Sequence, residues 1–352
     1  TINTLTKMKK LISILMIAAI FLAACSKEKL NEQPLNESPD VFNDIRLVTL
    51  TDGSKSTGIT MLEFTSIDHY ENTIGALEAL IEQHEDAFLS TWSSLDDDAL
   101  NAKEEEVGFV DYQPLIDFEN AYNIPSSMRQ AFELAEADWL DNEELDTETD
   151  PSKVYSFDIA EMTLLNADGE VKIGDVLLKL TNKGFVKIDN VDVATLIRIK
   201  EGDLSAYLEP TVTTNIEFDG GEKSGSDCHW WKGKDYWDEY VTNSKKVKLH
   251  VHFHSYPWKG VSKARITSYK KSGSKWKQYR MNLGVANQSD FRDNNCSNSL
   301  LMWSGWKHKK RKSINKGNDS WGAFPQYRAE NGASVFGQFQ YAGNSSTRVL
   351  VW

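Results

Sequence analysis

Three histidines alternate with apolar residues in His250-Val-His-Phe-His254, and imidazole serves proteins both as a metal ligand and as a general base. In a β-strand His250, His252 and His254 would share one face. Neighbouring histidines would lie about 7 Å apart at Cα and could share Zn²⁺, whereas the outer pair would be about 13 Å apart. A metal site would therefore need a ligand from another strand. The alternatives are a half-solvated strand face and a general base.

No catalytic signature accompanies these histidines. The chain contains neither Gly-x-Ser-x-Gly nor His-Glu-x-x-His, and the glycine-rich stretch 218–227 lacks the spacing of a phosphate-binding loop. The sequence favours a protein that is not an enzyme, with a metal-dependent hydrolase that uses the histidine strand as an alternative.

A second cluster of chemistry-bearing residues is basic. It lies in 307–312, where we expect a solvated loop with the cations Lys307, Lys309, Lys310, Arg311 and Lys312. Such a loop could bind the phosphates of lipopolysaccharide or an acidic polysaccharide through counterion release. The alternative is that these cations face acidic residues of the same chain.

Aromatic residues are dense just after residue 228. Trp230, Trp231, Tyr236 and Trp237 lie close together in the sequence, and further tryptophans follow at 258, 276, 303, 306 and 321. Exposed rings on a β-sandwich stack against sugars, which would make this part of the chain a glycan-binding module. The alternative is that the rings fill a core, since each buries about 150–250 Å².

Charge and tryptophan content both change near residue 220. Residues 26–220 hold 13 Lys and Arg against 43 Asp and Glu, whereas residues 221–352 hold 23 against 9. Nine of the 11 tryptophans follow residue 220. A length of 352 residues suits two domains. We predict an acidic domain at 46–217, a linker at 218–227 and a basic, tryptophan-rich domain at 228–352.

The acidic domain has the pattern of an α+β fold. We expect strands at 45–50 and 60–64, a helix after Thr65 or Ser66, a helix near 100–106 and another after Ser126 or Ser127. Residues 112–118 look like a packing loop. Strands are then expected at 155–159, 162–165, 171–173, 176–180 and 185–188. The alternating carboxylates Asp146, Glu148 and Asp150 indicate a solvated loop, with a weak Ca²⁺ site as the alternative.

The basic domain has strand periodicity almost throughout, which predicts an all-β, sandwich-like fold. Expected strands cover 245–256, 261–270, 275–285, 299–306, 333–341 and 347–352, with a hairpin turn at 271–274.

The N-terminal 25 residues have the features of a signal peptide. Lysines precede an apolar run that is too short to span a membrane. The run ends at Leu22-Ala-Ala-Cys25, which resembles the lipobox of bacterial lipoproteins and implies lipidation, as by palmitate, of Cys25. Residues 26–45 would be a polar tether. Ser26, in place of an Asp, implies the outer membrane, on its periplasmic or its surface face.

Lipidation of Cys25 would leave two further cysteines, Cys228 and Cys296. An extracytoplasmic setting would let these two form a disulfide, with two buried thiols as the alternative.

The patterns Met61-Leu-Glu-Phe, Leu164-Leu-Asn-Ala-Asp-Gly and Gly184-Phe-Val-Lys-Ile resemble those of uncharacterised Bacteroidota outer-membrane lipoproteins. That resemblance implies a membrane-anchored protein but no activity. We expect a binding module for glycan or polyanionic surface material; the alternative is an accessory subunit of an outer-membrane complex. No cofactor beyond the lipid is expected, apart from Zn²⁺ or Ca²⁺ in the alternatives above, and nucleic acid is not an expected partner.

Overall fold

The computed structural model describes residues 40–53, 58–142, 145–146, 148–216, 231–239, 244–293, 297–322, 326–327, 336–341 and 348–351. Asp40–Phe42 form a short 3₁₀ helix, η1. From Asn43 onward the chain forms one compact unit. Among the described helices, none combines the length and the apolar character that crossing a membrane requires.

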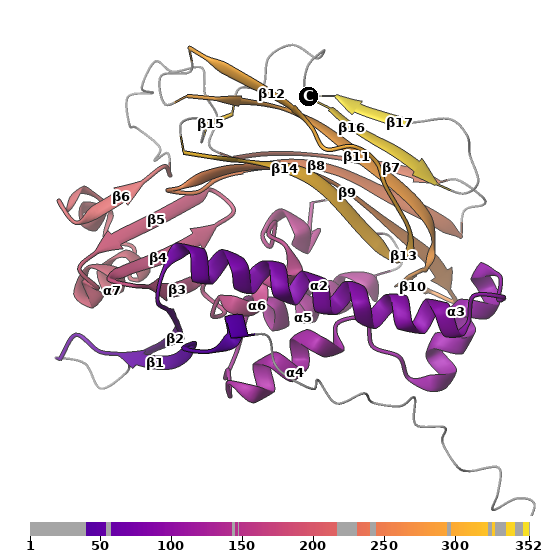
Figure 1. Ribbon diagram of the computed structural model, residues 1–352, viewed down its shortest axis with the longest axis horizontal. Coiled ribbons are helices and arrows are strands. Elements are labelled where there is room, and N and C mark those ends of the chain that lie inside the picture. The colour runs from indigo at the N-terminus through magenta and orange to yellow at the C-terminus, as the bar shows by residue number, and fades with distance from the viewer. Residues whose placement is uncertain are drawn as a thin grey trace, which may run out of the picture. The chain divides into compact units, whose positions relative to one another are not determined.

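A mixed sheet organises the acidic part of the chain, 46–216 (Figure 1). Its strands lie side by side in sequence order: β1 (Arg46–Leu50), β2 (Ile59–Phe64), β3 (Glu170–Ile173), β4 (Val176–Thr181), β5 (Gly184–Asp189) and β6 (Val212–Thr214). Strands β2 and β3 are parallel, and all other neighbours are antiparallel. The long excursion between β2 and β3 is helical, as a parallel connection requires.

The helices of this part are α2 (Ile67–Thr91), α3 (Asp97–Val107), α4 (Gln113–Ala121), α5 (Met128–Leu140), α6 (Ile159–Leu164) and α7 (Val193–Lys200), with the 3₁₀ helices η2 (Pro151–Lys153) and η3 (Leu204–Leu208). Ser66 and Ser127 cap α2 and α5, since each hydroxyl accepts from a first-turn amide. The expected helices at these serines and near residue 100 are confirmed.

Three expectations for this part were wrong. Residues 112–118 belong largely to α4, which Pro114 helps to begin at a position where no amide donor is needed. Residues 155–158 form a loop in place of the strand expected at 155–159, and residues 159–164 form α6 in place of the strand expected at 162–165. Five of its six residues are buried, including the polar Glu161 and Thr163, and a short segment that is buried on almost all sides does not show a helical period.

The basic part, 231–351, consists of two antiparallel sheets, so the predicted fold class is confirmed (Figure 1). The first contains β7 (Trp231–Glu239), β8 (Lys245–Ser255), β9 (Lys259–Ser272), β10 (Lys275–Gln278) and β14 (Ser313–Trp321). The second contains β11 (Met281–Arg292), β12 (Ser299–Trp303), β13 (Lys307–Arg311), β15 (Gln326–Tyr327), β16 (Phe336–Tyr341) and β17 (Arg348–Val351).

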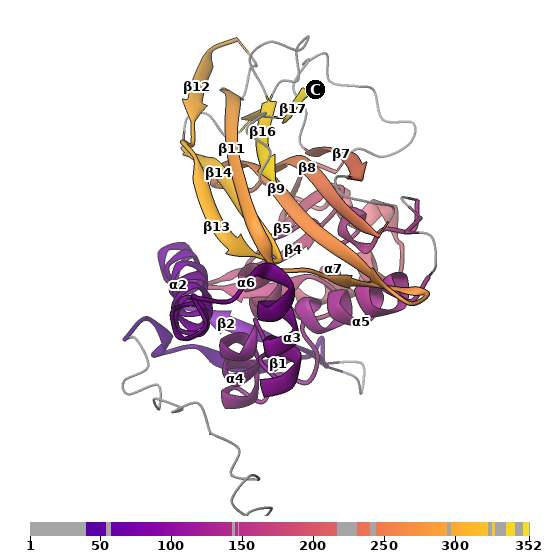
Figure 2. The same ribbon diagram turned by 90° about the vertical axis from the view of Figure 1, so that its right-hand side faces the viewer.

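A core fills the space between these two sheets, where they face each other in Figure 2. It includes Val247, Leu249 and Val251 of β8 and Leu283 and Val285 of β11. Each such aliphatic side chain stabilises the fold by about 1.5–3 kcal/mol. The opposite face of β8 and β9 contacts the acidic part, for example through Lys248 with Asp150 and Lys263 with Asp158, so these two strands are covered on both faces.

Candidate functional site

The outward face of the β11 sheet carries a group of ring and amide side chains. Leu283 and Val285 point into the core, so Gly284, Ala286 and Gln288 point outward. Residues paired directly across antiparallel strands share a face. The register therefore adds Trp303 and Phe336 beside Gln288, Gln338 beside Ala286, and His308 with Gln340 beside Gly284.

Contacts hold these side chains in place. The rings of Trp303 and Phe336 lie 6.2 Å apart between centroids. Trp306 stacks on His308 at 5.3 Å and 18°, and His308 Nε2 lies 2.9 Å from Gln340 Oε1. Gly284 leaves room for this pair, since a Cβ atom there would lie only 2.6 Å from the His308 ring.

Both tryptophans of this group reach solvent: Trp303 is 46% exposed and Trp306 37%. Planar apolar rings beside amides, each of which both donates and accepts hydrogen bonds, suit a ligand with apolar faces and hydroxyl edges. We call this set the aromatic face; its members are Trp303, Trp306, His308, Phe336, Gln288, Gln338 and Gln340.

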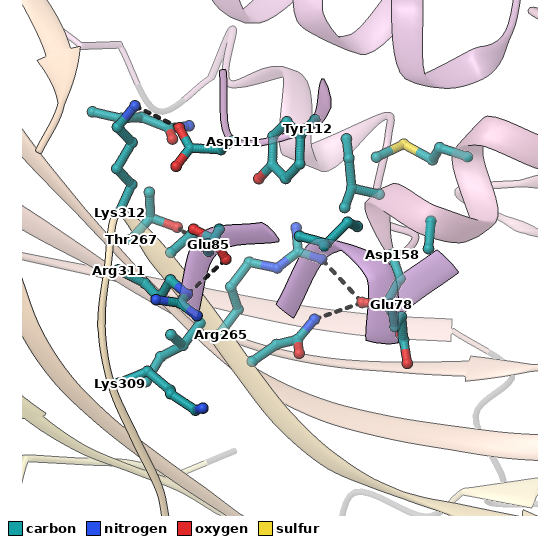
Figure 3. Close-up of a pocket in the computed structure, with 18 of the residues that line it drawn as sticks. Glu78, Glu85, Asp111, Tyr112, Asp158, Arg265, Thr267, Lys309, Arg311 and Lys312 are labelled. Carbon is teal, nitrogen blue, oxygen red and sulfur yellow. Dashed lines mark hydrogen bonds and ion pairs between the residues drawn. The ribbon is translucent and has the colours of Figure 1, made fainter. Parts of the chain in front are cut away.

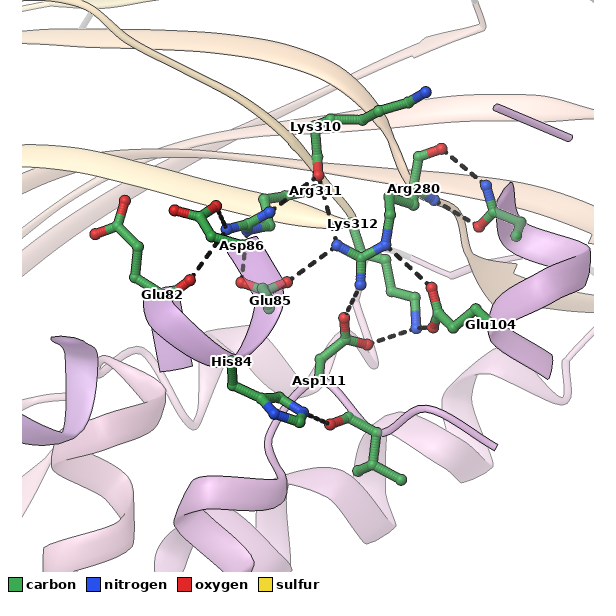
Figure 4. A network of polar contacts seen from close by, with 12 residues as sticks. Glu82, His84, Glu85, Asp86, Glu104, Asp111, Arg280, Lys310, Arg311 and Lys312 are labelled. Atoms are coloured by element: carbon green, nitrogen blue, oxygen red, sulfur yellow. Dashed lines mark hydrogen bonds and ion pairs between the residues drawn. The ribbon is translucent and has the colours of Figure 1, made fainter. Parts of the chain in front are cut away.

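The basic segment 307–312 was expected to be a solvated loop, and this was wrong. Residues 307–311 form β13, which pairs with β11. The segment lies against α2 and α3, where carboxylates are abundant (Figure 4). Lys309 pairs with Glu82 at 2.8 Å, and Lys310 with Asp97 at 2.8 Å.

The next two cations are also paired within the chain. Arg311, which is buried, lies 2.6 Å from Glu85, and Lys312 pairs with Glu104 and Asp111. Burial alone would lower the pKa of Lys312, but Asp111 and Glu104 raise it above its usual value. Lys307 is half-buried. The charges expected to bind an external polyanion are thus largely engaged with the acidic part.

A buried arginine extends this network. Arg280 is fully buried and binds Glu104 at 3.0 Å, Glu85 at 3.2 Å and Asp111 (Figure 4). Burial raises the pKa of Glu85 to about 7, against the opposing effect of Arg311 and Arg280. The network joins α2, α3 and the segment before α4 to the start of β11. These ion pairs hold the acidic part and the basic part of the chain together.

The three histidines lie on β8 and share one face, as the alternation predicts, but that face is buried and not half-solvated. The ring centroids of His250 and His252 lie 5.0 Å apart, and those of His252 and His254 lie 4.9 Å apart. Nε2 of His254 lies 2.9 Å from the carbonyl oxygen of Ser156, and burial lowers the pKa of His254 to about 3. Burial also lowers the pKa of His252. Both rings are therefore neutral near pH 7.

The histidine strand and the acidic stretch near 146–150 were the two expected places for a metal ion. Within the described ranges, no three side chains of His, Cys, Asp or Glu are grouped closely enough to hold a metal ion. Asp150, one of the alternating carboxylates, is buried and pairs with Lys248 of β8.

The side chains of several predicted site residues lie outside the described part of the structure. Trp231, Tyr236 and Trp237 lie on β7, which pairs with β8, but the structure describes only their backbone. Trp230, Cys25, Cys228 and Cys296 lie outside the described residues, as does the predicted linker. The lipidation and the disulfide stay predictions.

Sequence reasoning did not single out the aromatic face. Trp303 and Trp306 stood out only as scattered tryptophans, and the glutamines carried no signal of their own. The usable signal was the alternation Phe336-Gly-Gln-Phe-Gln340, which places Gln338 and Gln340 on one face of a strand. Their meeting with Trp303 depends on strand order, which alternation does not specify.

Comparison with known proteins gives little further information. No family model matches the chain, and no curated protein matches it. Among solved structures, the chain is similar to a DUF4848 family protein from Bacteroides thetaiotaomicron, with 13% identity and a TM-score of 0.20 over 87% of this chain and 100% of the other. No conclusion about function follows from a similarity of this size.

Proposed function

We propose that this protein is a glycan-binding module and that the aromatic face is its binding surface. The observation that carries the proposal is the placement of two solvent-exposed tryptophans and three glutamines on one face of one sheet. The rings would stack on the apolar faces of sugar units, and the amides would hydrogen bond to their hydroxyl groups.

The extent of this surface favours a polysaccharide over a single sugar as the ligand. Trp303 and Trp306 lie at the two ends of the loop that connects β12 to β13, and Phe336 and Gln340 lie on β16. The group therefore spans several strands. Leu301 and Val349, which are 56% and 51% exposed, share the same face by register. A ligand that touches all of these needs several linked units.

The basic segment contributes less to this proposal than the sequence indicated. Lys309, Lys310 and Lys312 already have carboxylate partners, and an external polyanion would have to displace them. We therefore place recognition on rings and amides. Binding should then depend only weakly on salt, since few counterions are released.

The experiment is a binding assay of the whole chain against a panel of neutral and acidic polysaccharides, by affinity electrophoresis and calorimetry. Trp303→Ala should weaken binding at least tenfold, because an interfacial tryptophan commonly contributes 2 kcal/mol or more. The matched control is Trp321→Ala, since Trp321 is 49% exposed but lies on β14 of the other sheet. Equal effects of the two substitutions, or no binding to any polysaccharide, would exclude the aromatic face.

The cellular setting belongs to the same proposal. Lipid on Cys25 would anchor the protein in the outer membrane, with residues 26–45 as the tether, and would hold the aromatic face near surface polysaccharide. An accessory role in an outer-membrane complex is the alternative. Affinity purification with a stoichiometric protein partner and no polysaccharide binding would favour that alternative.

A further inference from the structure

A second candidate site lies inside the molecule. A cavity of about 360 Å³ separates the helices of the acidic part from the face of β8, β9 and β14 that points away from the sandwich core (Figure 3). This volume is at the lower end of the range for small-molecule sites and suits a ligand of monosaccharide size. None of the aromatic-face residues lines it.

The cavity holds an arginine with few close partners. Arg265 of β9 is 16% exposed, and its Nη2 donates to the Phe157 carbonyl oxygen at 3.3 Å and to Asp158 at 3.4 Å. Within the described part of the chain, its Nε and Nη1 donate no hydrogen bond. A guanidinium has five donors in a planar fork, so most of its capacity is unused.

Three aspartates that line the cavity or lie beside it are already engaged with other cations. Asp158 binds Lys263 and also accepts from Asn315 at 2.7 Å. Asp150 binds Lys248, and Asp111 binds Lys312 and Arg280. Arg265 is thus a largely buried cation that shares its carboxylate partner, Asp158 at 3.4 Å, with Lys263, and an incompletely paired cation in such a place costs free energy unless a further anion joins it.

Donors and acceptors surround the guanidinium. Figure 3 shows the hydroxyl of Tyr112 pointing into the same space as Arg265. Glu136 lines the cavity and accepts from Gln278 at 2.9 Å, and burial raises the pKa of its carboxyl. These groups would meet hydroxyl groups of a ligand. Several nearby carboxylates would repel a dianion such as phosphate, which leaves a monoanion as the better match.

One side of helix α2 forms the entrance. Gly75, Glu78, Ala79 and Glu82 line the cavity, are exposed, and follow the spacing of one helical face. A Cβ atom on Gly75 would meet nothing within 4 Å. Two small residues one turn apart therefore leave an opening between α2 and the strands.

We propose that this cavity binds a small monoanionic, hydroxyl-bearing molecule, a sugar acid, whose carboxylate pairs with Nη1 of Arg265 and, in place of the 3.4 Å contact with Asp158, with Nη2. Such bidentate pairs are short and strong, and they select planar carboxylates. The ligand's hydroxyl groups would lie toward Tyr112, Glu136 and Asp158. This site is separate from the aromatic face, and either can exist without the other.

The test is calorimetry and ligand-observed NMR on the full chain with D-glucuronate and D-galacturonate as probes, and with D-glucose and inorganic phosphate as comparisons. We expect binding of at least one uronate, and binding of glucose and phosphate that is at least tenfold weaker. Arg265→Met should reduce uronate affinity at least tenfold, and Arg265→Lys should reduce it less. Trp303→Ala should leave it unchanged, which separates this site from the proposed polysaccharide surface.

Gly75→Trp provides a variant that leaves the charges alone, in case Arg265→Met does not fold. The indole would narrow the entrance and should weaken uronate binding at least tenfold, whereas Gly75→Ala should bind as the wild type does. The proposal is overturned if the wild type binds neither uronate, if it binds phosphate or glucose as tightly, or if a folded Gly75→Trp variant binds normally.

Discussion

Nε of Arg280 lies 3.0 Å from Oε2 of Glu104, although the two residues are 176 positions apart in the sequence. The same guanidinium also binds Asp111 and Glu85. One buried cation at the start of the second sheet thereby binds three segments of the acidic part. The opposite charges of the two parts of the sequence attract each other at this contact.

Arg280→Met should lower the free energy of unfolding by about 3–5 kcal/mol, because it leaves buried carboxylates without their cation. Urea denaturation measures the loss. Lys275→Met is the matched control, since Lys275 pairs with Asp141 at 2.8 Å and both side chains are exposed. That substitution should cost less than about 1 kcal/mol. Similar losses of stability in the two variants would show that the Arg280 ion pairs do not hold the two parts of the chain together.

Acid should destabilise the protein through the buried histidines. The pKa of His254 is about 3 in the folded state and about 6.5 in the unfolded chain, so below pH 6.5 the unfolded chain binds a proton that the folded state does not. The stability contributed by this group is complete above pH 6.5 and is lost progressively as the pH falls toward 3.

His254→Gln removes this proton uptake. Its stability deficit relative to the wild type should therefore shrink by about 2 kcal/mol between pH 7.5 and pH 5. Denaturant melts at the two pH values test this. A deficit that does not change with pH would show that His254 is not held neutral by burial.

Gly284→Val should weaken polysaccharide binding without removing any ring. The new side chain would displace the His308 ring, on which Trp306 stacks, and so misplace one of the two exposed tryptophans. A loss of severalfold or more in the affinity electrophoresis assay is expected. His308→Asn removes the same stacking partner, and it should give a loss of similar size.

Cys25→Ala should abolish incorporation of radiolabelled palmitate and move the protein from the membrane pellet to the soluble fraction. Ser26→Ala is the control, since it leaves the cysteine intact and should be labelled as the wild type is. Labelling that persists in the Cys25→Ala variant would place the lipid elsewhere.

A disulfide between Cys228 and Cys296 would close a loop of about 70 residues and stabilise the fold by about 4 kcal/mol. Alkylation before and after reduction, followed by mass spectrometry, should show these two thiols protected until reduction. Cys228→Ser should lower the midpoint of urea unfolding under oxidising conditions only. Two alkylated thiols in the unreduced, denatured protein would contradict the pairing.

Local signals in the sequence predicted much of the fold. Ser66 and Ser127 marked helix starts because a hydroxyl there satisfies an amide that the helix leaves unpaired. The turn at Lys271–Ser274 was recognisable from Gly273, whose φ of 65° favours glycine. The alternation of Val247, Leu249 and Val251 indicated a core face, and the core lies there.

The errors occurred where a local pattern is compatible with two structures. Residues 159–164 are buried on almost all sides, so their period could not distinguish a strand from a buried helix. Residues 307–312 are basic, and the sequence indicated solvent exposure for them. Residues 307–311 form β13 instead and lie against α2 and α3, whose carboxylates stabilise the cations in place of water.

The sequence by itself determined which side of each strand is apolar, because alternation follows from the geometry of a single strand. It also determined that one part of the chain is acidic and the other basic. Only the tertiary structure decided the environment of the polar sides. His252 and Arg265 lie beneath the acidic part, whereas Trp303 and Gln338 face outward. The burial of a polar face depends on which distant segment covers it, and that is a property of the whole fold.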